Sequence, residues 1–448
     1  MSHRYLPHTP RDIRKMLEVI GVPEIDSLLE PIPANLRERA ALDLPEGMDE
    51  QSLKTHLLDL ASRQTLPEAG GMFLGGGAYN HFQPGVIDFV LMRSEFFTSY
   101  TPYQPEISQG TLQAIFEYQT LICQLTDLEV SNASLYDGAS GLAEALLLAR
   151  RVKRRPRLLL ARNMHPDYRA VSRTYLSGSD AEITEIPFAK SGTVDLASLE
   201  EALDGDVAAV ALQSPNFFGC VENLAEVARL THAAGALLIA ACTEPVSYGV
   251  LRGPGALGAD VAVGDGQSFG LPPSYGGPWF GYFSCRAEHV RQLPGRLVGQ
   301  TRDTNGRRGY VLTLATREQH IRRHRATSNI CTNQSLCALA GAAFLATLGK
   351  SGLAELARRN LSKAEYARKV IRETAGAAFP FSAPTFNEFV VEVKADPEQV
   401  LARLHDEGLL GGIALSRWYP ELERAILVCV TEMNPKSSID LLARGLKT

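Results

Sequence analysis

The sequence predicts an α/β protein, in which a large domain with a mostly parallel central sheet is followed by a small C-terminal α+β domain. Short apolar runs alternate with helical stretches between residues 157 and 284, and this alternation is typical of a parallel sheet covered on both faces. After about residue 335, two helical patterns precede short strands, which indicates a second, smaller domain. The length of 448 residues exceeds one ordinary core and fits this division.

The elements follow from the spacing of apolar residues along the chain. An amphipathic helix followed by several prolines indicates an N-terminal arm (1–75), before the large domain (76–335) and the small domain with its linking helix (336–448). Short aliphatic runs predict strands at Arg157–Ala161, Ala181–Pro187, Val207–Gln213, Leu237–Ala241, Asp260–Val263 and Trp279–Ser284. Apolar residues at helical spacing predict helices at Pro10–Ile20, Ile107–Leu125, Leu142–Val152, Leu196–Leu203, Val221–Ala234, Ser335–Leu348 and Leu353–Thr374. The small domain contributes Phe389–Val393, Val400–Asp406 and Ile426–Val430.

Composition and charge argue against several classes of function. A net charge of −5 disfavours nucleic acid as the main partner. No apolar run reaches the ~18 residues that a membrane span requires, and the first residues lack the apolar stretch of a secretory signal. The seven cysteines are scattered and include no C-x-x-C pair, which fits reduced thiols. We therefore expect a cytoplasmic protein that binds neither nucleic acid nor a membrane.

A run of small residues, Asp137–Gly141, stands just before one of the expected helices. Backbone N–H groups at a helix N-terminus can hold an anion, and the small side chains of Gly138, Ala139 and Ser140 leave them accessible. A Gly-rich cap without a ligand explains the run equally well. His165 follows the next strand, where a ring can stack on a cofactor, although a histidine after a strand is more often structural.

Four sequence blocks carry the most specific signal. They are FLGGGAYNH at 73–81, YTPYQPEISQG at 100–110, YDGAS at 136–140 and ATSNICTNQ at 326–334. In this order, the blocks resemble the P-protein of the glycine cleavage system, glycine dehydrogenase (decarboxylating), over essentially the whole chain. The similarity is to the N-terminal half of long P-proteins, which in many prokaryotes is a separate chain, subunit 1, paired with a catalytic subunit 2. The resemblance implies the type I pyridoxal-phosphate (PLP) transferase fold.

The chain departs from this family at both chemical anchors of the cofactor. Enzymes of this fold hold PLP on a lysine as a Schiff base and pair its ring nitrogen with an acidic residue. No lysine occurs between Ser191 and Gly349, and the resemblance places the lysine position at Ser268 and the acidic position at Ala241. Glu244 is three residues further on and is expected to face elsewhere. We expect no catalytic residue in this chain and a vestigial cofactor site at Gly138, Ala139, Ser140 and His165.

The same resemblance suggests why a silent subunit would be retained. In this fold the cofactor lies at a subunit interface, and each subunit lends residues to its neighbour's site. Two segments are suited to this role, a polar aromatic loop and a turn at the place where related enzymes offer a hydroxyl and an N–H to the neighbour's cofactor phosphate. The candidates are Tyr100, Thr101, Tyr103, Gln104 and Ser108 in the loop and Thr327, Ser328 and Asn329 in the turn. The alternative is that these residues only pack the interface.

His320 and His324 are spaced i, i+4 but stand among four arginines between residues 317 and 325. A basic face of this density repels a divalent cation, so we expect no metal site there. The arginines are expected to form ion pairs or an interface, or to steer an acidic protein partner.

The sequence thus predicts the non-catalytic subunit of glycine decarboxylase. In the family, the assembly decarboxylates glycine through PLP bound by the catalytic subunit and transfers the aminomethyl group to the lipoyl arm of the H-protein. The expected partners are subunit 2, in an α2β2 heterotetramer, the lipoylated H-protein, and glycine as substrate. Two alternatives stay open: an independent PLP enzyme with a displaced lysine, such as Lys190 or Lys350, and a non-enzymatic scaffold or regulatory protein with a silent PLP fold.

Overall fold

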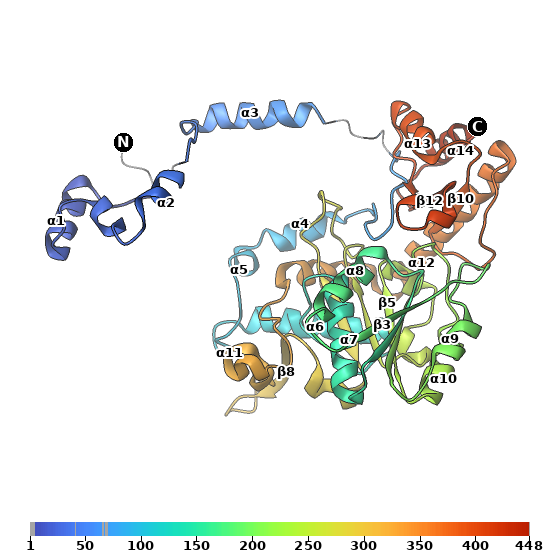
Figure 1. Ribbon diagram of the computed structural model, residues 1–448, viewed down its shortest axis with the longest axis horizontal. Coiled ribbons are helices and arrows are strands. Elements are labelled where there is room, and N and C mark those ends of the chain that lie inside the picture. Colours follow the sequence, from blue (N-terminus) through green and yellow to red (C-terminus); the bar gives the residue numbers. More distant parts are fainter. Residues whose placement is uncertain (1–4, 41, 65–66, 68–69, 448) are drawn as a thin grey trace. The chain divides into compact units, whose positions relative to one another are not determined.

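The computed structural model describes residues 5–40, 42–64, 67 and 70–447 and divides into two units, Met1–Thr65 and Leu66–Thr448 (Figure 1). The described part of the first unit contains the helices α1 (Pro10–Ile20), α2 (Ala34–Arg39) and α3 (Glu50–Ser62). Helix α1 has the limits expected from the sequence. It begins because the side chains of Thr9 and Asp12 form a capping box, and it ends at Gly21 in the left-handed conformation.

A seven-stranded sheet in the order β1-β7-β6-β5-β4-β2-β3 forms the centre of the second unit. Its strands are β1 (Val130–Ser131), β2 (Arg157–Ala161), β3 (Glu182–Ile186), β4 (Val207–Gln213), β5 (Leu237–Cys242), β6 (Val261–Asp265) and β7 (Gly281–Cys285). Strands β3, β2, β4, β5 and β6 pair in parallel, whereas β7 and β1 are antiparallel at one edge. All residues of β4 are buried, as a parallel sheet covered on both faces requires. The predicted mostly parallel sheet is confirmed.

The helices of the second unit are α4 (Gly85–Leu91), α5 (Ser94–Phe97), α6 (Gln109–Thr126), α7 (Gly138–Lys153), α8 (Pro166–Leu176), α9 (Leu196–Ala202), α10 (Leu224–Ala233), α11 (Gln319–Arg322), α12 (Ser335–Ala375), α13 (Pro397–Asp406) and α14 (Lys436–Gly445). Helix α7 packs across β4 to β7. Its N-terminus therefore lies against the centre of the sheet, near the strand ends that carry the candidate site.

Helix α12 is interrupted at Gly349, which has a φ of 62° and a non-helical ψ. This break confirms the two helices expected on either side of it. By length and composition alone, α12 is apolar enough to cross a membrane. However, its residue Phe344 packs in the core around Phe269, and Ile371 packs in the core around Phe389. Both halves of α12 thus contribute side chains to the interior of the second unit.

Two smaller sheets complete the second unit. The first is antiparallel, has the order β10-β12-β11, and consists of β10 (Glu388–Glu392), β11 (Ile413–Ala414) and β12 (Ala425–Cys429). Its two longer strands confirm those predicted for the C-terminal region. The second is a hairpin of β8 (Leu297–Arg302) and β9 (Arg308–Thr313), which the sequence did not predict. The domain limits at residues 75 and 335 stay a prediction.

Candidate functional site

The positions assigned to the lysine and the acidic residue lie at the carboxyl-terminal ends of adjacent parallel strands. Ala241 is the second-last residue of β5, and Ser268 follows the end of β6. Both residues are buried, and the Ser268 hydroxyl has no hydrogen-bond partner among the described residues. The Oε2 atom of Glu244 lies 2.9 Å from Nε2 of His81, so this carboxylate is engaged by another side chain.

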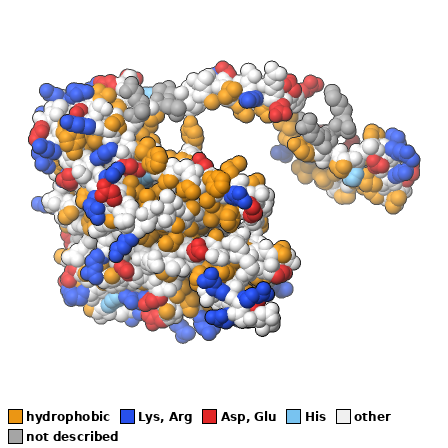
Figure 2. Space-filling view, turned by 180° about the vertical axis from the view of Figure 1, so that it is seen from behind, with side chains coloured by type: hydrophobic (Ala, Val, Ile, Leu, Met, Phe, Trp, Pro, Cys, Tyr) orange, Lys and Arg blue, Asp and Glu red, His pale blue; other side chains and the backbone are white. Residues whose placement is uncertain are grey.

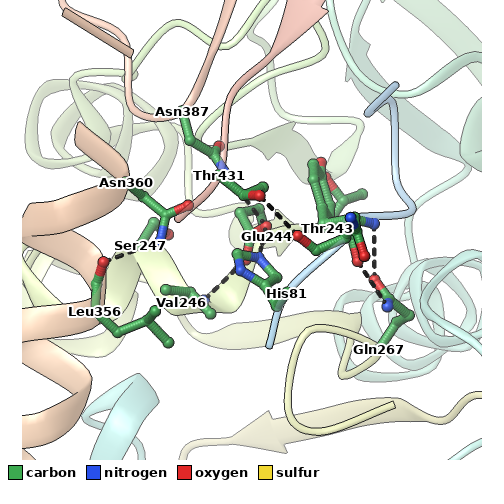
Figure 3. A network of polar contacts seen from close by, with 12 residues as sticks. His81, Thr243, Glu244, Val246, Ser247, Gln267, Leu356, Asn360, Asn387 and Thr431 are labelled. Carbon is green, nitrogen blue, oxygen red and sulfur yellow. Dashed lines mark hydrogen bonds and ion pairs between the residues drawn. The ribbon is translucent and has the colours of Figure 1, made fainter. Parts of the chain in front are cut away.

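Gln267, at this edge of the sheet, forms hydrogen bonds to a segment near the start of the second unit (Figure 3). Its Oε1 accepts a hydrogen bond from the backbone N–H of Tyr79 at 2.9 Å, and its Nε2 donates to the Tyr79 carbonyl at 3.0 Å and to that of Leu271 at 2.6 Å. The Tyr79 hydroxyl in turn donates to Glu388 at 2.9 Å. The residue beside Ser268 is therefore used to hold the chain itself.

Two aspartates of the chain occupy the N-terminus of α7. The backbone N–H of Gly138 donates to Oδ1 of Asp265 at 3.0 Å, and that of Ser140 donates to Oδ1 of Asp137 at 2.7 Å. The Tyr168 hydroxyl donates to the other oxygen of Asp265, and burial raises the pKa of this carboxyl to about 6. The sequence predicted that this helix begins at Leu142, but it begins at Gly138. The earlier start follows from the capping box that Asp137 and Ser140 form. Of the three residues predicted to hold an anion, Gly138 and Ser140 thus already donate their N–H groups to carboxylates.

The tight packing at Gly138 predicts that even a methyl group is excluded there. A Cβ at Gly138 would lie 1.9 Å from the Tyr168 hydroxyl and 2.7 Å from the carbonyl carbon of Gly264, which is backbone. We expect Gly138→Ala to lower the free energy of unfolding by about 1–3 kcal/mol through overpacking. Gly178→Ala is the matched control, because a Cβ at Gly178 meets nothing within 4 Å. Denaturant unfolding compares the two, and equal stabilities would show that this helix end is not closely packed.

His165 also makes its contacts within the chain. Its Nε2 lies 2.6 Å from the Gly76 carbonyl oxygen, to which it donates, and its Nδ1 accepts from the backbone N–H of Asp167 at 3.1 Å. Burial lowers the pKa of His165, which favours the neutral ring with the proton on Nε2. The ring also packs edge-on against Phe217 at 5.0 Å. The predicted stacking residue is bound to the glycine-rich segment that begins the second unit.

These residues do not fit PLP as a cofactor of this chain. There is no amine at Ser268 to form a Schiff base and no carboxylate at Ala241 to pair with a ring nitrogen. The anion-binding end of α7 is bound to Asp265, and the His165 ring is hydrogen-bonded to Gly76. The site in this chain is therefore closed by its own side chains.

The predicted loop before α6 lies largely at the surface. The side chains of Tyr100 and Tyr103 are 80% and 59% exposed. Thr101 has a buried hydroxyl without a partner among the described residues, Gln104 is exposed, and the Ser108 carbonyl accepts from Leu112 to begin α6. This loop therefore exposes the aromatic side chains of Tyr100 and Tyr103.

The predicted turn at Thr327–Asn329 is held by local hydrogen bonds. The Thr327 N–H donates to the Arg317 carbonyl at 3.2 Å, and the Ser328 hydroxyl accepts from the Ile330 N–H at 3.0 Å. Asn329 is exposed. The turn is ordered by its own side chains, with Thr327 half-exposed.

Arg296, immediately before β8, joins the loop to the residues that follow this turn. The sequence analysis did not identify it. Its guanidinium donates to the Tyr103 hydroxyl at 3.0 Å, to the Cys331 carbonyl, to the Thr332 hydroxyl at 3.2 Å and to Oδ1 of Asn333 at 3.3 Å. Thr332 and Asn333 belong to one of the four distinctive sequence blocks, so the sequence offered a way to identify them as candidates. Arg296 stands outside those blocks, so the sequence offered no such indication for it.

A run of exposed apolar side chains lies on the segment of α4, α5 and the following loop. It consists of Phe82, Val86, Phe89, Met92, Phe97 and Ile107. Figure 2 shows that hydrophobic side chains gather broadly on the face of the larger unit turned toward the viewer. An apolar surface of this kind is typical of a protein–protein interface.

Comparison with known proteins gives one consistent result. The model of the glycine cleavage system P-protein family matches residues 3–446 of this chain. The chain is 51% identical to the probable glycine dehydrogenase (decarboxylating) subunit 1 of Geotalea uraniireducens and 49% identical to that of Desulfitobacterium hafniense, with 99% of each chain covered in both comparisons.

Solved structures extend this likeness to three dimensions. A crystal structure of glycine decarboxylase (P-protein) of the glycine cleavage system, in inhibitor-bound form, is 43% identical with a TM-score of 0.90, and 99% of both chains is covered. A sphingosine-1-phosphate lyase of Burkholderia pseudomallei, at 17% identity and a TM-score of 0.67 over 91% of this chain and 92% of its own, shows the type I PLP-transferase fold alone. This chain belongs to the glycine cleavage system P-protein family.

Proposed function

We propose that this chain is the non-catalytic subunit of a two-subunit glycine decarboxylase. Its relatives are named subunit 1 of glycine dehydrogenase (decarboxylating), and the name implies a partner subunit. One observation carries the proposal. The place where a type I enzyme would hold PLP is filled in this chain by Asp265 at the helix N-terminus and by the contact of His165 with Gly76, and Ser268 stands where the lysine is expected.

PLP is used in this family of folds, and we assign its binding to the partner subunit. Bound there, PLP would act as an electron sink for the electrons left when glycine loses carbon dioxide. The hydroxyls of Tyr103 and Thr327 would donate hydrogen bonds to its phosphate from this chain. The exposed apolar segment of α4 and α5 would cover the partner's site against water. The role of this chain is then to bind, orient and exclude solvent.

The wider assembly follows from the same proposal. The exposed apolar side chains of α4 and α5 suit a large interface with the catalytic subunit, and two such pairs would form an α2β2 heterotetramer. The aminomethyl group would pass to the lipoyl arm of the H-protein. A soluble bacterial enzyme of glycine catabolism of this kind would be cytoplasmic. Sedimentation of the mixed subunits at micromolar concentration tests the complex, and separate species only would contradict it.

The two alternatives receive less support from the structure. Lys190 and Lys350 are both exposed, whereas the Ser268 position is buried, so neither lysine shares that environment. A subunit that served only as a scaffold would not need the Tyr103 hydroxyl in a fixed position, and Arg296 fixes that position by a hydrogen bond. The scaffold and the trans-acting subunit differ in whether removing that hydroxyl changes the partner's chemistry.

Removing one hydroxyl from the loop or the turn provides this test. We expect Tyr103→Phe and Thr327→Val to leave the complex assembled but to weaken PLP retention by about 1–3 kcal/mol, since each removes one hydrogen bond to a charged group. Cofactor affinity and decarboxylation rate are measured on complexes of verified equal stoichiometry. Tyr275→Phe is the control, because Tyr275 is 93% exposed and lies outside both segments. Unchanged values for Tyr103→Phe and Thr327→Val would reduce these residues to interface packing.

A further inference from the structure

Arg296 is a buried cation without a counter-ion in the described part of the chain. Its side chain belongs to a residue that is only 3% exposed, and no Asp or Glu oxygen there lies within ion-pair distance of its guanidinium. Burying a charge without a partner costs several kcal/mol. Arginine at such a place therefore indicates that its charge or its hydrogen-bonding geometry serves a specific purpose.

The hydrogen bonds of Arg296 use all four N–H groups of its two terminal nitrogens. Nη1 donates to Thr332 Oγ1 at 3.2 Å and to Asn333 Oδ1 at 3.3 Å, whereas Nη2 donates to Tyr103 Oη at 3.0 Å and to the Cys331 carbonyl. Only Nε is left without a partner, and it is buried. The two terminal nitrogens therefore have no free N–H group for a ligand, so Arg296 acts through the residues that it holds.

The direction of these hydrogen bonds fixes what the two hydroxyls can do. Arginine has donors only, so the oxygens of Tyr103 and Thr332 must accept from it. Each hydroxyl then keeps its own proton to donate, and neither Tyr103 nor Thr332 has another side-chain hydrogen bond within the described residues. The guanidinium also lies 5.2 Å from the centre of the Tyr103 ring, which restrains the ring itself.

We infer that Arg296 is a positioning residue that sets the hydroxyls of Tyr103 and Thr332 as donors toward an oxyanion brought to the interface by the partner subunit. This inference rests on the proposed function. The oxyanion is the phosphate of the partner's PLP or the carboxylate of glycine, which share this chemistry. Either oxyanion would also supply the negative charge that Arg296 lacks within its own chain. A hydroxyl that accepts a hydrogen bond from a cation is itself a stronger donor.

A double-mutant cycle between Arg296→Lys and Tyr103→Phe in the reconstituted complex tests the inference. Lysine keeps the charge but has three donors from one atom, so it cannot hold four acceptors at once. We expect each single variant to weaken binding of the oxyanion by about 10-fold or more. This loss is measured as the PLP affinity of the cofactor-free complex if the oxyanion is the phosphate, and as the KM for glycine if it is the carboxylate. The double variant should lose no more than Arg296→Lys alone, because that substitution already misplaces the Tyr103 hydroxyl. Arg155→Lys is the control, because Arg155 donates only to the carbonyls of Val207 and Ala234.

The ligands used in the titration distinguish the two oxyanions. Pyridoxal lacks the phosphate, so unchanged pyridoxal affinity beside weakened PLP affinity identifies the phosphate. A coupled rise in the KM for glycine, with unchanged affinity for both cofactor forms, identifies the carboxylate. Either result supports the inference. If Arg296→Lys prevents assembly, Thr332→Val tests the second donor instead. It should weaken binding of the same oxyanion as Tyr103→Phe does, and normal binding of that oxyanion would overturn the inference.

Additive losses of binding free energy for Arg296→Lys and Tyr103→Phe would overturn the inference. Normal PLP affinity and a normal glycine KM for Arg296→Lys, when Tyr103→Phe alters one of them, would overturn it as well. Both of these results leave the proposed function intact, because Tyr103 would still act on the partner's site. Wild-type behaviour of the Tyr103→Phe complex would also overturn the inference, because Tyr103 would then be interface packing alone. The proposed function fails on a different result, namely a stoichiometric PLP adduct on a lysine of this chain together with glycine turnover by the isolated chain.

Discussion

Replacing His81 with glutamine is expected to lower the free energy of unfolding by about 3–5 kcal/mol, the range found when one member of a buried ion pair is removed. His81 lies between two carboxylates, and its side chain is 4% exposed. Its Nε2 is 2.9 Å from Glu244 (Figure 3), and its Nδ1 is 2.8 Å from Glu432. Without its charge, two carboxylates would remain buried without their shared cation. The two acids come from the loop after β5 and the loop after β12, so the loss also loosens the junction between them.

The pH dependence of this contribution has a defined direction. Burial lowers the pKa of His81, but the two glutamates outweigh it and raise the pKa from 6.5 to about 10. The stabilisation is therefore complete below pH 6.5 and is lost as the pH rises through about 10. Burial raises the pKa of Glu432, but the hydrogen bond and charge of His81 outweigh it and lower that pKa to about 2, so its contribution is present above pH 4.5 and is lost as the pH falls through about 2.

Denaturant unfolding of wild type and His81→Gln at several pH values measures both effects. The difference in stability should be largest near pH 5–6 and should narrow above about pH 10, since His81 is then neutral in the wild type as well. His405→Gln serves as the control, because His405 is exposed on α13. A difference below about 1 kcal/mol at pH 6 would mean that the two carboxylates are stabilised without His81.

The isolated chain is expected to show no decarboxylation of glycine, and addition of the catalytic subunit should restore it. Enzymes accelerate reactions by at least about a million-fold, so the contrast is the largest that we expect. Ser268→Lys alone should not create activity, because Ala241 still offers no partner for the ring nitrogen and Asp265 still occupies the helix N-terminus. Carbon dioxide release from carboxyl-labelled glycine measures turnover. Robust activity of Ser268→Lys alone would show that Ala241 is not the acidic position.

Strands with strong local signals could be predicted from the sequence. The expected limits of β2 and β4 are those observed, since each is a buried aliphatic run that begins after a polar residue or a proline. The break in α12 was visible because Gly349 separates two apolar patterns. The hairpin of β8 and β9 was missed because its mostly polar, half-exposed residues give no clear alternation of apolar side chains.

The arrangement of the candidate site depended on pairings between distant residues. Asp265 meets Gly138 across 127 positions, and Arg296 meets Tyr103 across 193. The absence of a lysine could be read directly, but the occupation of the helix N-terminus by Asp265 could not, since nothing local pairs an aspartate after β6 with the start of α7. For the same reason, Arg296 could not be distinguished from the other arginines of the chain.

Borohydride reduction of the reconstituted complex with bound PLP, followed by mass-spectrometric mapping of the modified lysine, tests the central claim most directly. The reagent fixes a Schiff base permanently to the lysine that forms it. We predict one modified lysine per pair of subunits, located entirely in the catalytic partner, and no stoichiometric modification of this chain alone or in the complex. A stoichiometric adduct on a lysine of this chain, such as Lys190 or Lys350, together with glycine turnover by the isolated chain, would contradict the account.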